Sequence, residues 1–80
     1  MKAKVHVTLK NGVLDPQGAA ITSALGHLGF NDVAGVRVGK YIELDLMESN
    51  ADDAKAAVEK MCEKLLANTV IEKYQVELVD

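Results

Sequence analysis

Hydrophobic and polar residues alternate strictly near the start of the chain. Val5, Val7 and Leu9 fall on one face of an extended segment, and the residues between them are polar. This period of two predicts a half-buried strand over residues 4–10. The alternation returns over residues 73–78, where tyrosine, valine and leucine take turns with lysine, glutamine and glutamate, and it predicts a last strand there.

A helix is predicted soon after the first strand because both of its ends are marked. Asp15 is suited to be the N-cap, and Pro16 suits the first helical position. Gly29 can adopt the left-handed conformation that ends a helix, with Phe30 and Leu25 placed as the apolar pair of a Schellman cap. The apolar residues between these ends have the spacing of a core-facing stripe, which consists of Ala20, Ile21, Ala24, Leu25 and Leu28.

A second helix is predicted in the second half of the chain. Ser49-x-x-Asp52 has the pattern of a capping box, and aspartates in the first turn suit the helix dipole. Asn68 is suited to be the residue that ends the helix. The stripe expected to face the core consists of Ala54, Val58, Met61, Cys62 and Leu65.

The segment between the two helices is the most informative part of the pattern. From residue 36 to 46 the even positions are mostly aliphatic, and this parity continues through Gly39-Lys40. A two-residue hairpin at that pair would mix the two faces, and a three-residue loop would require a left-handed conformation at Tyr41. The remaining interpretation is one long strand that bends at Gly39.

The length of this segment bears on assembly. Sixteen extended residues, from 33 to 48, would reach about 53 Å, whereas a globule of this size is about 30 Å across. The segment must therefore fold back as a hairpin, bend sharply, or enter a second sheet completed by another chain. We predict an α+β domain of order β-α-β(-β)-α-β, related to the ferredoxin-like fold, with a long or bent middle strand shared across a dimer.

Composition narrows the class of protein. The 80 residues are 49% hydrophobic and carry a net charge of −3, which fits a single domain over residues 1–80. No apolar run is long enough to cross a bilayer, and the start of the chain does not read as a secretory signal. A single cysteine fits a reducing compartment, most simply the cytoplasm. The acidic balance argues against nucleic acid as a partner, and we expect no membrane partner either.

Two groups of residues resemble reactive sites but favour a simpler interpretation. Residues 35–41 resemble a phosphate loop, but only three residues separate the two glycines. Tyr41 stands where the motif has the Ser or Thr whose hydroxyl binds magnesium, and the context is a strand instead of a loop before a helix. These residues are interpreted as a glycine bend with two solvated cations. Cys62 has no basic neighbour at helical spacing, so it is expected to be a core residue rather than a nucleophile.

The remaining titratable residues also lack the companions that catalysis or metal binding requires. His6 lies on the polar face of the first strand, and His27 lies in the last turn of the first helix, where the dipole suits it. Glu43 and Asp45 share a strand face, but alternating charge in a strand is more often a solvated surface. We therefore expect no catalytic residue and no metal site.

The loop before the first helix, residues 11–18, contains more specific chemistry than a simple connection needs. Gln17 and Gly18 open a helix whose free N–H groups are suited to accept an anion or a partner's carboxylate. The alternative is an ordinary capped turn, in which Asp15 satisfies those groups.

Several motifs resemble those of the PurS family, the small subunit of phosphoribosylformylglycinamidine synthase. They are Leu-Lys-Asn-Gly-Val-Leu-Asp-Pro-Gln-Gly at 9–18, Leu-Gly-Phe at 28–30, Val-Arg-Val-Gly-Lys at 36–40, Met-Cys-x-Lys-Leu-Leu-Ala-Asn at 61–68, Val-Ile-Glu at 70–72, and Tyr74. The resemblance covers essentially the whole chain. Thr69 departs from it, because the family often has proline before Val-Ile-Glu, and this should only relax the turn.

The resemblance implies a non-catalytic assembly subunit of purine biosynthesis. Such chains form homodimers or larger assemblies between a synthetase subunit and a glutaminase subunit, and they support the delivery of ammonia. The complex uses ATP, magnesium and glutamine, and none of these is expected to bind this chain. As the partner interface we predict Asp15, Pro16, Gln17, Gly18, Arg37, Gly39 and Lys40.

Two other functions remain open at this point. An acylphosphatase-like hydrolase would have a similar size and fold, but it needs an arginine in the loop after the first strand, and residues 11–18 contain none. A regulatory ACT-like domain that binds a small molecule would also pair through its sheets. It would be stabilised by amino acids, whereas an assembly subunit would respond to its protein partners.

Overall fold

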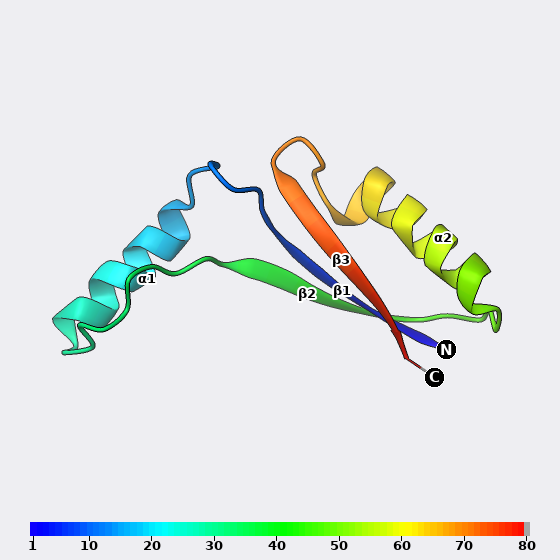
Figure 1. Cartoon of the computed structure of the whole chain (residues 1–80), viewed down its shortest axis with the longest axis horizontal. Helices are drawn as coiled ribbons and strands as arrows, with labels where there is room; N and C mark the ends of the chain where they lie inside the picture. Colours follow the sequence, from blue (N-terminus) through cyan, green and yellow to red (C-terminus); the bar gives the residue numbers. More distant parts are fainter. Residues whose placement is uncertain (80) are drawn as a thin grey trace.

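The computed structural model describes residues 1–79 and contains three strands and two long helices (Figure 1). In chain order the elements are β1 (Lys2–Leu9), α1 (Pro16–His27), β2 (Gly39–Asp45), α2 (Ala51–Met61), a π-helical turn η1 (Cys62–Leu66) and β3 (Glu72–Val79). The predicted α+β class is confirmed, and so is the order β-α-β-α-β. The middle segment is not a hairpin, because it contributes the single strand β2.

The three strands form one antiparallel sheet in the order β2-β1-β3. Val5, at the centre, lies opposite Ile42 on one side and Val76 on the other. Ala3, Val5 and Val7 are fully buried, as the alternation in the sequence predicts. The other face carries most of the polar residues of the three strands, among them Lys4 with its partners Glu43 and Glu77.

Helix α2 covers the apolar face of the sheet. Ala54, Val58 and Cys62 are completely buried, so this part of the predicted stripe is confirmed. The predicted capping box is wrong by one residue. Asn50 is the N-cap, and its side chain accepts a hydrogen bond of 3.1 Å from the Asp53 N–H, which leaves Ser49 outside the helix.

The end of α2 corrects the rest of that stripe. In η1 the Ala67 N–H donates to the Cys62 carbonyl, a bond that spans five residues instead of four. The wider turn rotates Leu65 outward, where it is 82% exposed, and Leu66 packs against the core instead. Asn68 does not end the helix in a left-handed conformation, because no residue other than glycine has a positive φ in the described chain.

Helix α1 has the predicted ends but not the predicted packing. Asp15 caps its start, and Gly29 ends it with φ +97°, with the Phe30 N–H donating to the Leu25 carbonyl as in a Schellman cap. Among its residues only Gly18 is buried. The expected core stripe Ala20, Ile21, Ala24, Leu25 and Leu28 is therefore wrong for this chain by itself, since none of these residues is buried.

The reason is the position of α1, which projects beyond the end of the sheet instead of lying beside α2 (Figure 1). The molecule measures 48 × 26 × 14 Å and has a radius of gyration of 16.0 Å. A compact domain of this length has a radius of gyration of about 12 Å. We refer to the sheet with α2 and η1 as the body, and to α1 with residues 28–36 as the arm.

Candidate functional site

The predicted interface residues lie together at the junction between body and arm, which we call the elbow (residues 9–18 and 36–40). Its centre is the Asp15 carboxylate, which is only 8% exposed. One oxygen accepts from the Gly18 N–H at 2.8 Å, and the other accepts from the Val38 N–H at 2.9 Å. One side chain therefore caps α1 and also holds the chain that returns from the arm.

The electrostatics of the elbow stabilise this carboxylate in its ionised form. The backbone N–H groups of Val38 and Gly18 lower the pKa of Asp15, and the nearby Arg37 charge adds to this. Partial burial acts in the opposite direction but does not reverse the shift. The elbow is therefore built around a permanent negative charge at neutral pH.

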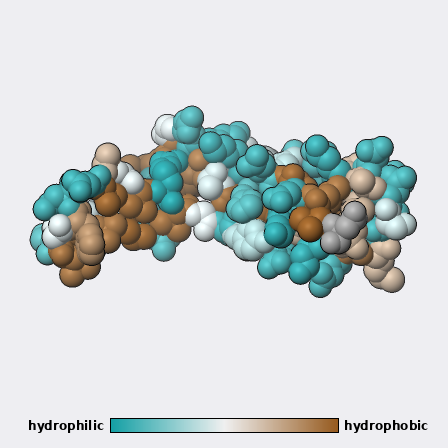
Figure 2. Space-filling model, turned by 60° about the horizontal axis from the view of Figure 1, so that its bottom comes forward, coloured by the Kyte–Doolittle hydropathy of each residue, from teal (hydrophilic) through white to brown (hydrophobic). Residues whose placement is uncertain are grey.

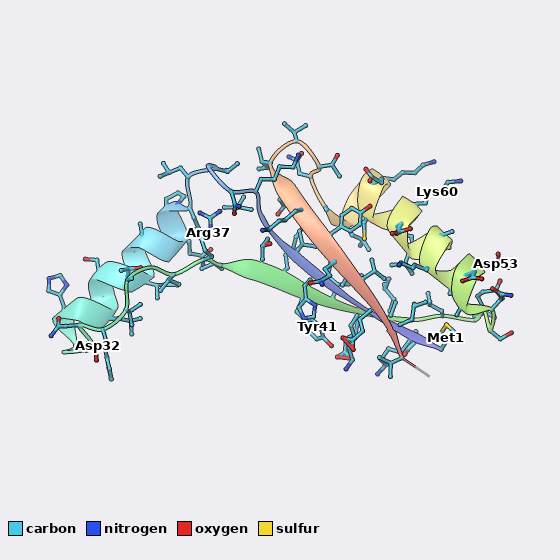
Figure 3. The ribbon with its side chains drawn as sticks, viewed as in Figure 1. Met1, Asp32, Arg37, Tyr41, Asp53 and Lys60 are labelled. Atoms are coloured by element: carbon cyan, nitrogen blue, oxygen red, sulfur yellow. The ribbon has the colours of Figure 1, made fainter. Side chains whose placement is uncertain are left out.

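Arg37 makes the second connection across the elbow (Figure 3). Its guanidinium donates to the carbonyl oxygens of Val13 and Lys10, each at 3.1 Å, and at 3.4 Å to that of Leu9. A planar group with five N–H donors can hold several carbonyls in this way. Arg37 is exposed, as expected of a solvated cation, but it also ties the returning chain to the loop before α1.

Two glycines allow the backbones to approach closely at the elbow. A Cβ atom on Gly18 would collide with the carbonyl oxygen of Val36, and one on Gly39 would collide with that of Val7. Lys40, at the start of β2, donates to the Leu66 carbonyl at 2.9 Å and lies 3.9 Å from the Glu72 carboxylate. Of the seven predicted interface residues, Pro16 and Gln17 are exposed without such contacts within the described chain.

The arm presents an apolar surface that the sequence pattern assigned to the core. Leu28 and Phe30 are 73% and 60% exposed, and Leu14, in the elbow just before the arm, is 81% exposed. Figure 2 shows hydrophobic side chains gathered over the arm, while hydrophilic ones dominate the body in that view. Residues 16–27 contain no Asp, Glu, Lys or Arg. Contiguous exposed apolar side chains are typical of interaction surfaces.

Residues 36–38 carry the alternation of a strand but are not in a strand here, and the extended segment before them reaches back to residue 33. The described chain gives β2 one neighbour only, β1, so its outer edge is unpaired. Unpaired edges are the usual place where a second chain adds a strand. The signal was present in the sequence as a segment too long for its own domain.

The polar side chains on the open face of the sheet pair with one another across the strands. Lys2 lies 3.4 Å from the Glu43 carboxylate, and the rings of His6 and Tyr41 stack with their centroids 4.9 Å apart. The two carboxylates Glu43 and Asp45 are both exposed on this face. This arrangement is that of a solvated surface, as predicted.

The body contains two titratable groups whose pKa values are raised, Cys62 and Tyr74. Cys62 is fully buried, and burial, with Glu63 and Glu59 nearby, raises the pKa of its thiol. The Tyr74 hydroxyl donates to the Glu63 carboxylate at 2.9 Å, which raises the pKa of Tyr74 to about 12. Within residues 1–79, no three His, Cys, Asp or Glu side chains are grouped to hold a metal ion. No helix in the same range has the length and apolar character to cross a membrane.

Comparison with known families and proteins gives one consistent result. Residues 2–80 match the PurS family, described as phosphoribosylformylglycinamidine (FGAM) synthase. The chain is 53% identical over 77 residues to the phosphoribosylformylglycinamidine synthase subunit PurS of Bacillus subtilis, covering 96% of this chain and 90% of that one. It is 46% identical over 77 residues to the PurS subunit of Methanocaldococcus jannaschii, covering 96% and 93%.

Solved structures agree. The Bacillus subtilis PurS structure superposes with a TM-score of 0.89 at 52% identity, covering 99% of this chain and 98% of that one. A chain in the Thermotoga maritima PurLQS structure superposes with a TM-score of 0.89 at 35% identity, covering 98% and 95%. The shape with a projecting arm is therefore shared by solved relatives over nearly their full length.

Proposed function

This chain belongs to the PurS family of phosphoribosylformylglycinamidine synthase subunits, and we propose that it acts there as a non-catalytic assembly subunit that pairs with a second copy and bridges the synthetase and glutaminase subunits. The observation that carries the proposal is the arm: a helix without charged side chains, held away from the body by the elbow, with its apolar residues exposed. A lone chain gains nothing from such a helix. A chain that assembles buries it.

The second copy is the first partner that we propose. Each chain offers an uncovered apolar arm and an unpaired β2 edge that continues into residues 33–38. Two copies related by a two-fold axis satisfy both features at once, because each supplies what the other lacks. The middle segment then contributes to two sheets, which resolves its excess length.

The proposed bridging role fits the reactivity of the chain's own side chains. A glutaminase needs a reactive nucleophile, and the only cysteine here is fully buried with a raised pKa. ATP, magnesium and glutamine are therefore assigned to the larger subunits, and this chain supports ammonia transfer by holding those subunits together. The name PurLQS of the Thermotoga maritima structure supports an assembly of this kind.

The elbow contributes to the proposed interface in two ways. Pro16 and Gln17 are exposed and are free to touch a partner, whereas Asp15 and Gly18 are buried and act by fixing the direction of the arm. Neither rival function has support here. A hydrolase site would need a free arginine in an anion loop, but Arg37 is engaged by three carbonyl oxygens.

Reconstitution tests the proposal. The chain is mixed with the synthetase and glutaminase subunits of the same organism, and complex formation and product formation are measured with glutamine or with free ammonia. We expect the three proteins to elute together, and glutamine-dependent turnover to require this chain while ammonia-dependent turnover does not. Turnover by the isolated chain, or full glutamine-dependent activity without it, would contradict the proposal.

A further inference from the structure

The elbow contains a turn in which an asparagine is followed by a glycine. The Val13 N–H donates to the Lys10 carbonyl at 3.1 Å and closes this turn around Asn11 and Gly12. Gly12 has φ +87°, which a glycine in the third position of a turn adopts readily, and both central residues are exposed. Within residues 1–79, no hydrogen bond involves the Asn11 side chain or the Gly12 N–H. The fold therefore engages neither group.

These two groups are suited to react with each other. The backbone nitrogen of Gly12 attacks the side-chain amide carbon of Asn11 and forms a five-membered succinimide ring. The bond from that carbon to the amide nitrogen breaks, and ammonia leaves with the proton that the backbone nitrogen gives up. Water then opens the ring at one of its two carbonyls, which yields aspartate or isoaspartate. Glycine favours the attack because it has no Cβ to obstruct it.

The other three asparagines of the chain lack this combination. Asn50 and Asn68 each accept a backbone N–H bond through the side-chain oxygen, which restrains the amide. Asn31 is exposed, but the next residue is Asp32, whose side chain obstructs the attack. Asn11 is therefore the asparagine at which both the sequence and the structure favour the reaction.

The product matters because of what holds the turn. Arg37 donates to the carbonyl oxygens of Lys10 and Val13, on either side of the reacting pair, each at 3.1 Å. Isoaspartate adds a methylene to the backbone between these two carbonyls, so the guanidinium no longer fits both. It also adds a carboxylate, which competes with the carbonyls for the same guanidinium.

We propose that Asn11 is a site of spontaneous deamidation, and that isoaspartate at this position loosens the elbow. The closed elbow slows the reaction, because the Asn11 side chain and the Gly12 nitrogen must rotate toward each other, and both the turn and Arg37 restrain that rotation. The consequence for assembly rests on the proposed function, since a loosened elbow matters to a second copy only if the arm pairs with it.

The first test is to age the purified chain at mildly alkaline pH and to follow each asparagine by peptide mass spectrometry. We expect Asn11 to convert about tenfold faster than Asn31, the exposed control, and to yield both aspartate and isoaspartate. In Asn11→Gln, where the ring would have six members, conversion at this position should be almost abolished. In Asn31→Gln, conversion of Asn11 should proceed as in the unaltered chain.

The second test releases the turn. Arg37→Gln removes the guanidinium from the carbonyls of Lys10 and Val13 and should speed the conversion of Asn11 severalfold. Lys40→Gln is the matched control, because Lys40 is also a cation of the elbow but donates to the Leu66 carbonyl instead. Its conversion rate should equal that of the unaltered chain. Equal rates in both variants would show that Arg37 does not restrain the reaction.

The third test measures what isoaspartate does to the elbow. Hydrogen exchange of the Val38 N–H, which Asp15 accepts at 2.9 Å, reports on the elbow without any partner. We expect this exchange to be about tenfold faster in the isoaspartate form, separated by chromatography, than in the unmodified chain. Asn11→Asp has the added charge without the added methylene and should change it less. Self-association, measured by sedimentation, should weaken in the same order.

Two outcomes would overturn the inference. If Asn11 converts no faster than the other asparagines, it is not the site. If exchange at Val38 is unchanged in the isoaspartate form, the product does not loosen the elbow, whatever sedimentation shows. A chain that does not self-associate even before ageing contradicts the proposed pairing instead, and the mass and exchange measurements still decide this inference.

Discussion

The body and the arm each contain one well-capped helix of three turns, and yet the two helices have opposite fates. Helix α2, with 11 residues, buries Ala54, Val58 and Cys62 completely. Helix α1, with 12 residues, buries only Gly18. Capping and apolar spacing therefore establish that a helix forms, but they do not establish which surface receives it.

The charged residues distinguish the two helices better than their apolar ones. Helix α2 carries Asp52, Asp53, Lys55, Glu59 and Lys60 on its exposed faces, as a helix in contact with water does. Helix α1 carries none of these residue types. A helix without a charged face is typical of helices that are buried on more than one side. In the assembly that we propose, that cover comes from another chain.

The largest expected difference between the two regions is in stability. Val5→Ala leaves a cavity at the centre of the body and should lower the free energy of unfolding by about 2–3 kcal/mol. Leu28→Ala in the arm removes a larger side chain, but that side chain is 73% exposed, so the unfolding of the dilute chain should change little. Urea denaturation at low protein concentration measures both.

The same pair of variants is then compared for self-association by sedimentation. Leu28→Ala should weaken it, because the arm is buried only in the proposed pair. If Leu28→Ala destabilised the dilute chain as much as Val5→Ala does, the arm would belong to the core of its own chain.

The next effect concerns the elbow, which sets the direction of the arm. Gly18→Ala places a methyl group against the carbonyl oxygen of Val36, a backbone atom, so α1 and the returning chain must separate. Gly26→Ala lies in the same helix with open space around it and is the matched control, with improved helix propensity. We expect Gly18→Ala to weaken self-association by at least tenfold while the body keeps its stability, and Gly26→Ala to leave self-association intact.

Equal behaviour of the two glycine variants would mean that the direction of the arm does not matter for assembly. Circular dichroism controls for the alternative that Gly18→Ala melts α1, since the helix content should then fall.

The sequence predicts the local features of both regions well. Asp15 as a cap, Gly29 as a helix end and the alternating faces of β1 and β3 depend on residues within a few positions of one another, and all are confirmed. The exposed arm and the outward Leu65 depend on interactions that no local pattern records. The first needs knowledge of where α1 packs, and the second needs the π-helical turn.

The same division holds for the candidate site. The sequence marks residues 11–18 by their loop chemistry and residues 35–41 by their glycines and cations, and the role of both segments toward a partner remains a prediction. What the sequence does not reveal is that they contact one another. The bond from the Val38 N–H to Asp15 spans 23 residues, and the bonds from Arg37 to the loop span 24 to 28. A pattern read along the chain has no access to such pairs.

The smallest expected effect is a change in self-association at low pH, caused by protonation of Asp15. It tests the attachment of the arm to the body by a substitution, Asp15→Asn, that keeps the shape of the side chain. The pKa of Asp15 lies below its ordinary value of 3.8, because the folded chain holds the ionised carboxylate by two N–H groups. The contribution of Asp15 to the stability of the elbow is therefore complete above the ordinary pKa and is lost as the pH falls through the lower, folded value.

In the unaltered chain, self-association should weaken below about pH 4 as the elbow loosens. Asp15→Asn, which keeps one acceptor oxygen, should be weaker at neutral pH and should lose this part of the pH dependence. Asp52→Asn, in the first turn of α2, controls for the loss of one carboxylate. Sedimentation from pH 7 down to pH 3 measures all three, and an unchanged pH profile in Asp15→Asn would show that the elbow carboxylate does not hold the arm.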